Sequence, residues 1–464
     1  SHRYIPPERS LAVYAAILRL YGFDPPGATT LAATLSQVER GLDSFIWNEN
    51  PSHSTVVVGS IWGMGRKTEP HITGDEWASA FARNTQHNYN GDNVILYTES
   101  LLAIVARLVG TVNTRWMTTL IAWSLFRQLS VYTDVRLLLA TAKASDACFT
   151  HVDNVMKLAF AAAYLHFVMP QETVKTATSL AMKIREAFHN ALNTSSWVES
   201  NVKRVALRKL SNMKFYIGSS GQRLDPAKID EYYDDVPDVD KNRFFKAYRA
   251  ALQAAAHQSW KDHTTYIFDE TKVNAYYATN LNTMVIPAAM LQHPFFNVRS
   301  PPALNYGSIG MTTAHEIMHG YDVDGSEYDA DNQVRKWTTP KFLKTYTERV
   351  ICIRDSHKTV ETRRARQADL DAIIDSENLA DIVGVAIAHA AFASLPLAER
   401  NVTLPGLNLT AEHLFFISHC AKLCESERVI VERYAPGRSR CIVPLMNMAA
   451  FSEAFQCAPN TPMN

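Results

Sequence analysis

The sequence contains no hydrophobic run long enough to cross a membrane. The most apolar stretch, residues 155–169, is interrupted by Lys157 and His166, whereas a membrane-spanning helix needs about 20 predominantly apolar residues. This stretch therefore predicts a buried helix. The chain opens on Ser1, and its first twenty residues lack the order of charged, apolar and small residues of a signal peptide. We expect either that a targeting segment has been removed or that the chain is a piece of a longer protein.

An excess of charge of either sign is also absent. Lys+Arg and Asp+Glu each count 46 among 464 residues, and no block of like charges occurs, so nucleic acid and anionic membranes are not expected as partners. Neither a glycine-rich phosphate loop nor a Gly-x-Ser-x-Gly turn is present, which leaves nucleotide-binding and serine-hydrolase functions without support. With 47% hydrophobic residues, a chain of this length can bury a large core and is expected to form two domains.

Cysteine is scarce, and so are strand signals in the first half. Six cysteines without a Cys-x-x-Cys pair are too few for a disulfide scaffold and offer no cysteine metal site. Residues 11–218 show apolar positions three and four apart, which predicts helices, with one short strand expected within 54–59. A Gly/Ser-rich and then Tyr/Asp/Pro-rich segment, residues 218–240, predicts a domain boundary. Residues 274–287 are predicted to form two extended segments around a polar turn at 280–283.

The most informative motif is His315-Glu316-Ile317-Met318-His319. Residues four apart lie on one face of a helix, so the two imidazoles can bind one ion. Zinc bound by histidines and a carboxylate keeps a position for water and lowers the pKa of that water to about 7. Glu316 is placed to take the water's proton and to pass it to the leaving amine. Taken alone, the motif also arises by chance in on the order of a few chains per hundred.

A second acidic element follows the motif. Glu377 lies 58 positions after His319 (377 − 319), and Asp381 lies four residues further, so both face one side of a predicted helix. We interpret Glu377 as the third zinc ligand and Asp381 as the acceptor that orients a ligating histidine. The alternative is an acidic helix face that only contacts water.

Three other histidines are weaker candidates. His413 and His419 are interpreted as ordinary helix residues, because no carboxylate or cysteine is spaced to join them at a metal. His389 stands three helical turns past Glu377, too far to share its ion. Three Asn-x-Ser/Thr sites, at Asn193, Asn401 and Asn408, are compatible with secretion.

Several further segments match one known family. Asn305-Tyr306-Gly307-Ser308-Ile309-Gly310-Met311 runs into the zinc motif, and His319-Gly320-Tyr321-Asp322 continues it. The chain here resembles the neprilysin and endothelin-converting-enzyme family of zinc endopeptidases, densely over residues 265–464 and in patches before. The other matching segments are Val273-Asn274-Ala275-Tyr276-Tyr277, Ile286-Pro287-Ala288, Leu291-Gln292, Pro294-Phe295-Phe296, Phe415-Phe416-Ile417-Ser418, Pro436-Gly437, Arg440, Phe451-Ser452-Glu453-Ala454-Phe455 and residues 197–218.

The resemblance implies a fold, a location and a set of roles. The implied fold is mainly α-helical, with a helical covering lobe over residues 1–236, of which a segment near 40–90 packs on the other lobe. A thermolysin-like gluzincin catalytic domain with a few short strands is implied over residues 237–464. The implied location is extracellular, as a secreted protein or the ectodomain of a single-pass membrane protein. The resemblance implies one zinc ion on His315, His319 and Glu377, catalysis by Glu316 and orientation of a zinc ligand by Asp381.

The resemblance also implies residues that bind the substrate. Asn274 and Ala275 would bind its backbone, and Arg440 would donate a hydrogen bond to one of its carbonyl groups. An apolar pocket for the residue after the scissile bond is implied at Met290, Phe295 and Met311.

The chain also departs from the family pattern. Tyr434 stands where the family has a histidine that stabilises the tetrahedral oxyanion, and a tyrosine hydroxyl can donate the same hydrogen bond. Near the pocket, Thr312, Lys422 and Leu423 replace residues that are usually apolar or aromatic. A peptidase is therefore expected, and the rival interpretation is a peptide-binding homologue that keeps the metal without cleaving.

The cysteines divide into two groups under the same resemblance. Cys420 and Cys441 do not match cysteines of the family, and they either bond to each other or remain two buried thiols. The remaining four resemble family half-cystines whose partners would lie outside this chain, and these are Cys148, Cys352, Cys424 and Cys457.

Overall fold

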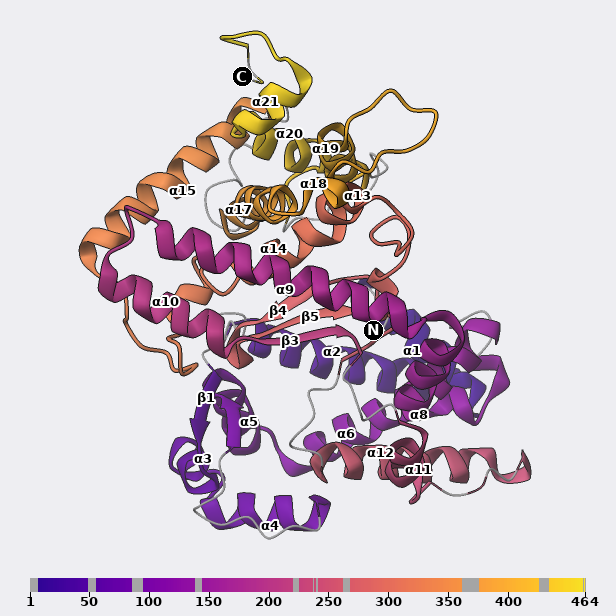
Figure 1. The fold of residues 1–464 in the computed structure, drawn as a ribbon. Helices are drawn as coiled ribbons and strands as arrows, with labels where there is room; N and C mark the ends of the chain where they lie inside the picture. Colours follow the sequence, from indigo (N-terminus) through magenta and orange to yellow (C-terminus); the bar gives the residue numbers. More distant parts are fainter. Residues whose placement is uncertain are drawn as a thin grey trace. The chain divides into compact units, whose positions relative to one another are not determined.

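The computed structural model describes residues 7–48, 56–85, 95–137, 144–219, 225–236, 238, 241–261, 268–360, 375–424, 434–461 and 463. The described chain is mainly helical and carries two small sheets (Figure 1). It divides into two compact units. The first comprises Ser1–Met156 and Tyr232–His263, and the second comprises Lys157–Glu231 and Thr264–Asn464. None of the described helices is long and apolar enough to cross a membrane.

The first unit is built from helices and a small two-stranded sheet. Strands β1 (Val56–Gly59) and β2 (Ile95–Thr98) pair antiparallel, which confirms the predicted strand within 54–59. Tyr14, Leu35 and Trp123 meet in a hydrophobic cluster formed by α1, α2 and α6. The helices are α1 (Pro7–Leu20), α2 (Pro25–Asn48), α3 (Ile61–Thr68), α4 (Gly74–Thr85), α5 (Glu99–Thr111), α6 (Thr114–Leu129) and α12 (Phe244–Lys261).

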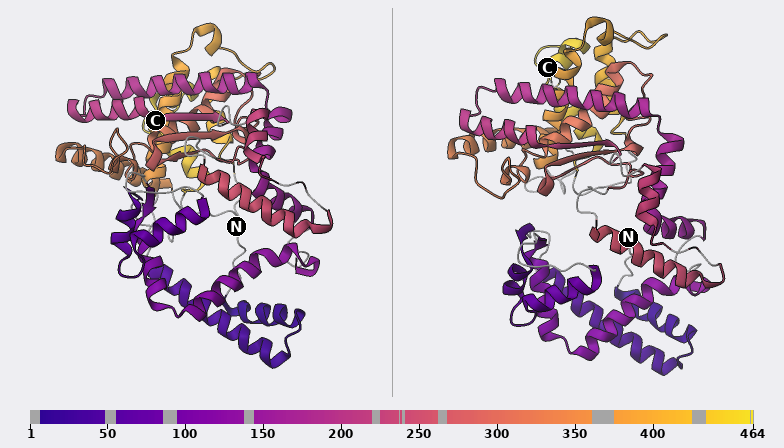
Figure 2. Two further views of the ribbon diagram at one scale, coloured as in Figure 1. Left: turned by 90° about the horizontal axis from the view of Figure 1, so that it is seen from below. Right: turned by 60° about the horizontal axis from the view of Figure 1, so that its bottom comes forward.

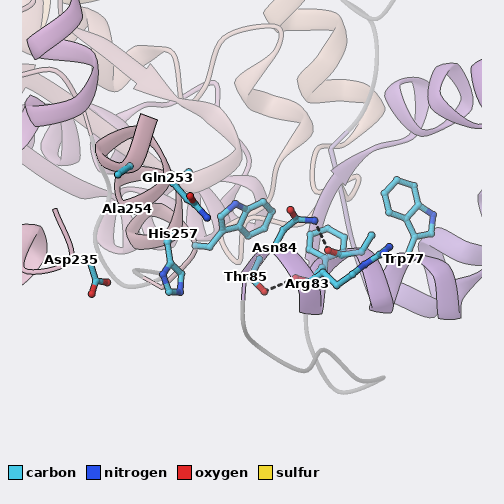
Figure 3. A pocket seen from close by; sticks show the side chains of 13 residues that line it. Trp77, Arg83, Asn84, Thr85, Asp235, Gln253, Ala254 and His257 are labelled. Atoms are coloured by element: carbon cyan, nitrogen blue, oxygen red, sulfur yellow. Dashed lines mark hydrogen bonds between the residues drawn. The ribbon is translucent and has the colours of Figure 1, made fainter. Parts of the chain in front are cut away.

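A cavity of about 930 Å³ lies between α4 and α12 of this unit. Figure 3 shows Trp77 and Arg83 contributed by α4, and Gln253 and His257 contributed by α12. The cavity contains none of the side chains predicted to bind metal or substrate.

The second unit surrounds a three-stranded sheet with helices. Helix α8 (Ala144–Val168) enters it and departs from helical geometry at Met156, the residue at which the two units divide. Helix α9 contacts β3 and lies beside the sheet (Figures 1 and 2). The other helices are α9 (Gln171–Thr194), α10 (Ser200–Asn212), α11 (Pro226–Tyr233), α13 (Pro302–Asn305), α14 (Met311–Met318), α15 (Pro340–Val360), α17 (Asp375–Ala393), α18 (Leu397–Arg400), α19 (Ala411–Ala421), α20 (Gly437–Met446) and α21 (Ala449–Phe455).

The three-stranded sheet has the order β3-β5-β4. Strand β5 (Thr283–Pro287) is buried along its whole length, pairs parallel with β3 (Lys214–Gly218) and antiparallel with β4 (Tyr276–Ala278). The two predicted extended segments are thus β4 and β5, joined by a turn in which Asn282 adopts a left-handed conformation (φ 47°). Strand β4 is an edge of this sheet and has a neighbour on one side only among the described strands.

The compact units do not coincide with the lobes predicted on either side of residue 236. Leu180 and Ile184 of α9 lie in the same hydrophobic core as Ala314 of α14, and α12 belongs to the first unit. Within the change of composition near 218–240, residues 225–236 are exposed or half-buried, whereas burial of the apolar face of α9 decides which unit the helix joins. That residues 1–236 form a lobe covering the catalytic domain stays a prediction.

Cys420 and Cys441 form a disulfide that joins α19 to α20, which decides between the two alternatives for this pair. Cys352 and Cys424 are exposed free thiols, and the side chain of Cys148 lies outside the described residues. The asparagines of the three predicted glycosylation sites are all exposed.

Candidate metal centre

The zinc motif lies on a helix held by its apolar face. Helix α14 (Met311–Met318) carries His315 and Glu316, and His319 follows directly as its C-cap residue. Ala314 and Ile317 are fully buried on the opposite face, in the main hydrophobic core. The spacing of four residues brings the two imidazole rings together with centroids 4.7 Å apart, as the sequence predicted.

Helix α17 brings the third ligand, and a glycine allows its close approach. A Cβ atom at Gly384 would lie 3.2 Å from the backbone nitrogen of His315 and 3.2 Å from the carbonyl oxygen of Met311. Any larger residue would push α17 away from α14. Because the helices pack this closely, Glu377 at the start of α17 reaches both histidines.

The three predicted ligands converge through the atoms that a metal would use. Glu377 Oε2 lies 3.2 Å from His315 Nε2 and 3.6 Å from His319 Nε2. The two Nε2 atoms are 3.1 Å apart, and one ligand atom from each of the three residues lies within 4.8 Å of the others. Two imidazole nitrogens and one carboxylate are the donor set of catalytic zinc sites, which leave a fourth position for water. The residues therefore fit a zinc ion.

Each histidine is oriented by a second carboxylate on its other nitrogen. His315 Nδ1 lies 2.9 Å from Asp381 Oδ1, and His319 Nδ1 lies 2.7 Å from Asp322 Oδ2. A carboxylate that accepts the Nδ1 proton directs the lone pair of Nε2 toward the metal. The role of Asp381 was predicted from the sequence, whereas that of Asp322 was not, although Asp322 follows His319 by three residues, about one helical turn.

Arg440 and Tyr434 adjoin this centre. Arg440 donates two hydrogen bonds to Asp381, from Nε at 2.6 Å and from Nη2 at 2.8 Å. Its guanidinium carbon lies 4.6 Å from the centre of the Tyr434 ring, a cation–π distance. Asp381 is fully buried and thus accepts from both a zinc-ligand histidine and an arginine.

The electrostatics of the centre follow from burial and from these contacts. Burial would raise the pKa of Glu377 and of Asp381, but hydrogen bonds from His315, and from Arg440 in the case of Asp381, hold both well below their usual range. Burial would lower the pKa of His319, but its contacts with Asp322 and Glu377 raise it to about 11. Glu316 has no such partner, so burial raises its pKa.

The predicted substrate-binding residues lie around the same core. Asn274 is exposed and Ala275 is buried, directly before edge strand β4. Met290 and Met311 are buried in the main hydrophobic cluster, and Phe295 packs against it. The structure brings these side chains to the domain that carries the metal centre.

The comparisons with known proteins agree with this geometry. Two models of the family described as "Peptidase family M13" match residues 8–220 and 274–464. This chain belongs to peptidase family M13. The M13 family comprises zinc metallopeptidases of the neprilysin and endothelin-converting-enzyme type, as the sequence motifs indicated.

Relatives of known sequence and structure cover most of this M13 chain. Endothelin-converting enzyme 1 of Bos taurus is 26% identical over an alignment of 398 residues that covers 80% of this chain and 52% of that protein. Neprilysin-3 of Drosophila melanogaster is 29% identical over 333 residues, 68% of this chain and 42% of that protein. The zinc metalloprotease ZMP1 of Mycobacterium tuberculosis shares the fold, with a TM-score of 0.75 at 19% identity over 98% of this chain and 72% of that chain. The chain spans about half the length of the curated relatives it matches.

The three other histidines considered from the sequence lie outside the metal centre. His413 Nε2 contacts the carbonyl oxygen of Ala454 at 2.8 Å, and its Nδ1 takes part in capping α19. His389 Nε2 lies 2.8 Å from a carboxylate oxygen of Glu412, and His419 is fully buried in the core. Among the described residues, the group that could hold a metal ion in this M13 chain is His315, His319 and Glu377.

Asp322→Asn is expected to weaken zinc binding by about 10- to 100-fold, because it removes the carboxylate that orients His319. Chelator competition on the purified chain measures the zinc dissociation constant. Asp331→Asn, which alters an exposed carboxylate paired with Arg208, is the matched control and should leave the constant unchanged. Equal constants for Asp322→Asn and the unsubstituted chain would contradict the assignment.

We predict that the buried His419 makes the folded protein less stable in mild acid. Burial and the neighbouring Lys422 lower its pKa to about 3, so between pH 6.5 and 3 the unfolded chain binds the extra proton and stability falls as the pH falls. The loss from this group at pH 5 is about 2 kcal/mol. Denaturant unfolding at pH 7 and pH 5 measures it. His419→Met should reduce the difference between the two pH values, and an undiminished difference would show that other groups cause it.

Proposed function

We propose that this chain is a zinc-dependent endopeptidase that hydrolyses oligopeptides, with one zinc ion on His315, His319 and Glu377. The observation that carries the proposal is the convergence of two Nε2 atoms and one carboxylate within 4.8 Å beside a buried glutamate. Each histidine has a carboxylate on its other nitrogen, and family membership supports the same activity.

Glu316 would act as general base and then as general acid. When bound, zinc supplies a water of lowered pKa and polarises the scissile carbonyl. The Glu316 carboxylate takes the water's proton and later donates it to the leaving amine. Its raised pKa favours the second task, because a proton held on this carboxyl group is retained until the amine accepts it. No covalent intermediate with the protein is expected.

Strand β4 offers a place for the substrate backbone. An edge strand has unpaired N–H and C=O groups, and an extended peptide can add to it as a further strand. We propose that Asn274 and Ala275, which lead into β4, hold the peptide in this way. Arg440, fixed by its two hydrogen bonds to Asp381, would donate to a substrate carbonyl.

Met290, Phe295 and Met311 would form the pocket for the residue after the scissile bond. Met311 supports this placement because it precedes His315 by one helical turn on the same face of α14. All three side chains belong to or pack against one hydrophobic cluster.

The location and the covering lobe are part of the same proposal. The exposed asparagines of the three sequons and the Cys420–Cys441 disulfide support an extracellular protein. We further propose that the helices of residues 1–236 cover the catalytic domain and limit the size of the peptides admitted.

A second candidate function is a peptide-binding homologue that holds zinc without cleaving. The observation that favours it is Tyr434, which stands where the family has an oxyanion-binding histidine and whose ring lies against the guanidinium of Arg440. If Tyr434 does not donate to the oxyanion, the chain would bind peptides and release them intact.

Glu316→Gln separates these functions. The zinc-loaded chain is expected to cleave a quenched fluorescent peptide library, and Glu316→Gln should abolish cleavage while zinc content stays at one per chain, because Glu316 is not a ligand. Zinc content by mass spectrometry and the initial rate of fluorescence increase are measured on both proteins. Zinc at one per chain with no cleavage above the Glu316→Gln background would favour the binding protein.

Tyr434→Phe tests the hydroxyl directly. Loss of one hydrogen-bond donor to an oxyanion typically lowers kcat by about 10²–10³, and the ring of phenylalanine preserves the packing against Arg440. We expect that fall in kcat with little change in KM. Tyr434→His should retain activity, and an unchanged kcat in Tyr434→Phe would exclude the proposed role of the hydroxyl.

A further inference from the structure

Lys422 places a cation against the helix that carries the metal ligands. It follows the last residue of α19, and its partly buried ammonium group lies at the junction between the π-helical turn η7 (Tyr306–Gly310) and α14. Nζ donates to Met311 Sδ at 2.7 Å, to the carbonyl oxygen of Ser308 at 3.3 Å and to Thr312 Oγ1 at 3.4 Å.

The three acceptors of this ammonium group are all neutral, and one of them is weak. A thioether sulfur accepts hydrogen bonds poorly, and a partly buried cation without an anionic partner is costly. Among the described residues, no carboxylate forms an ion pair with Lys422; its hydrogen-bond partners are the three given above. Burial accordingly lowers the pKa of Lys422 to about 7. Within the part of the chain that the structure describes, no carboxylate takes this place, so the group is well placed to accept an anion from a ligand.

The position of Lys422 relative to the catalytic residues follows from the helix. Met311 precedes His315 by four residues, and Thr312 precedes Glu316 by four, so the ammonium contacts side chains about one turn, roughly 5.4 Å, from the catalytic pair. The charges of Asp381 and Glu316 both act on Lys422, which agrees with this short separation. An extended peptide advances about 3.3 Å per residue, so the neighbour of the scissile carbonyl can reach this place.

We propose that Lys422 binds a carboxylate of the peptide at the residue that follows the scissile bond, carried either by an acidic side chain or by a free C-terminus. The inference rests on the proposed peptidase function, because that function defines the scissile bond. Met290, Phe295 and Met311 would surround the aliphatic part of that residue, and Lys422 would pair with its charged end. The site would thus select an acidic residue where an entirely apolar pocket would select a bulky apolar one.

A purely structural role for Lys422 makes a different prediction. If the ammonium group only links α19 to η7 through hydrogen bonds, its removal would change the stability of the fold and leave the preference among peptides unchanged. Lys422→Met keeps the length and the apolar stem of the side chain and removes the charge, so it tests the preference without opening a large cavity. Lys344→Met, at an exposed position of α15, is the matched control.

The experiment measures binding without turnover. Peptide affinities are determined by calorimetry with zinc-loaded Glu316→Gln, which is not expected to cleave, alone and combined with Lys422→Met or Lys344→Met. One arm uses peptides in which a single Glu, or Gln as its neutral counterpart, is moved along the sequence. The other arm compares free and amidated C-termini. Cleavage products of the unsubstituted chain locate the scissile bond in the same peptides.

We expect Glu to bind about 10- to 100-fold more tightly than Gln at the position after the scissile bond, as charge-assisted hydrogen bonds do. Lys422→Met should abolish this ratio and Lys344→Met should preserve it. A ratio that depends on Lys422 only in the C-terminal arm would identify the terminal carboxylate as the source. If the unsubstituted chain cleaves peptides but neither the Glu/Gln affinity ratio nor the free/amidated affinity ratio depends on Lys422, the inference is overturned and the proposed peptidase function still stands. A Lys422-dependent ratio without cleavage by the unsubstituted chain would contradict the peptidase and support carboxylate binding by Lys422.

Discussion

The contact between each zinc-ligand histidine and its own carboxylate is the constraint on which the centre depends. A hydrogen-bond acceptor on Nδ1, which is a carboxylate for both histidines here, leaves the lone pair of Nε2 directed at the metal. For His315 this requires Asp381, so α17 must lie against α14, and Gly384 permits that approach. For His319 it requires Asp322, whose other oxygen accepts a hydrogen bond of 2.7 Å from the backbone of Gly325.

The loop that follows α14 is held in a position that supports the contact between Asp322 and His319. A Cβ atom at Gly325 would lie 1.9 Å from the carbonyl oxygen of His319, so the chain can fold back onto Asp322 only with glycine there. The fully buried Lys209 donates from Nζ to the carbonyl oxygens of Gly325 at 2.7 Å and Tyr328 at 2.8 Å. A residue of α10, more than a hundred positions earlier in the sequence, thereby helps to fix the carboxylate that orients His319. This also explains why α10 belongs to the compact unit of the metal centre.

Local rules predicted the parts of the site that are near one another in the sequence. The spacing of His315 and His319 determines their common face once a helix forms, and the spacing of Glu377 and Asp381 does the same on α17. The resemblance to a family joined those two elements, since nothing in periodicity alone says that two helices meet. The grouping of α9 and α10 with the second unit, the contact of Lys209 with a distant loop and the neutral hydrogen-bond acceptors of Lys422 depend on tertiary packing, which composition does not encode. Asp322 was within reach of local reasoning, because it lies one helical turn from His319.

Charge balance shows why protons and a divalent ion compete for this centre. The charge of Asp381 is balanced by Arg440, which leaves Glu377 and Asp322 as the other two carboxylates beside the histidines. Against the effect of burial, contacts with Asp381 and Glu377 raise the pKa of His315, and contacts with Asp322 and Glu377 raise that of His319. Two imidazolium groups together carry a charge of +2, and one zinc ion carries the same charge. Either the two protons or the ion can therefore balance the two carboxylates. Zinc binding must then release the histidine protons, and its affinity rises with pH. Burial keeps the pKa of Glu316 above that of an ordinary carboxyl group, against the opposing charges of His315 and His319. On the proposed mechanism, the same burial suits Glu316 to hold the proton and later release it.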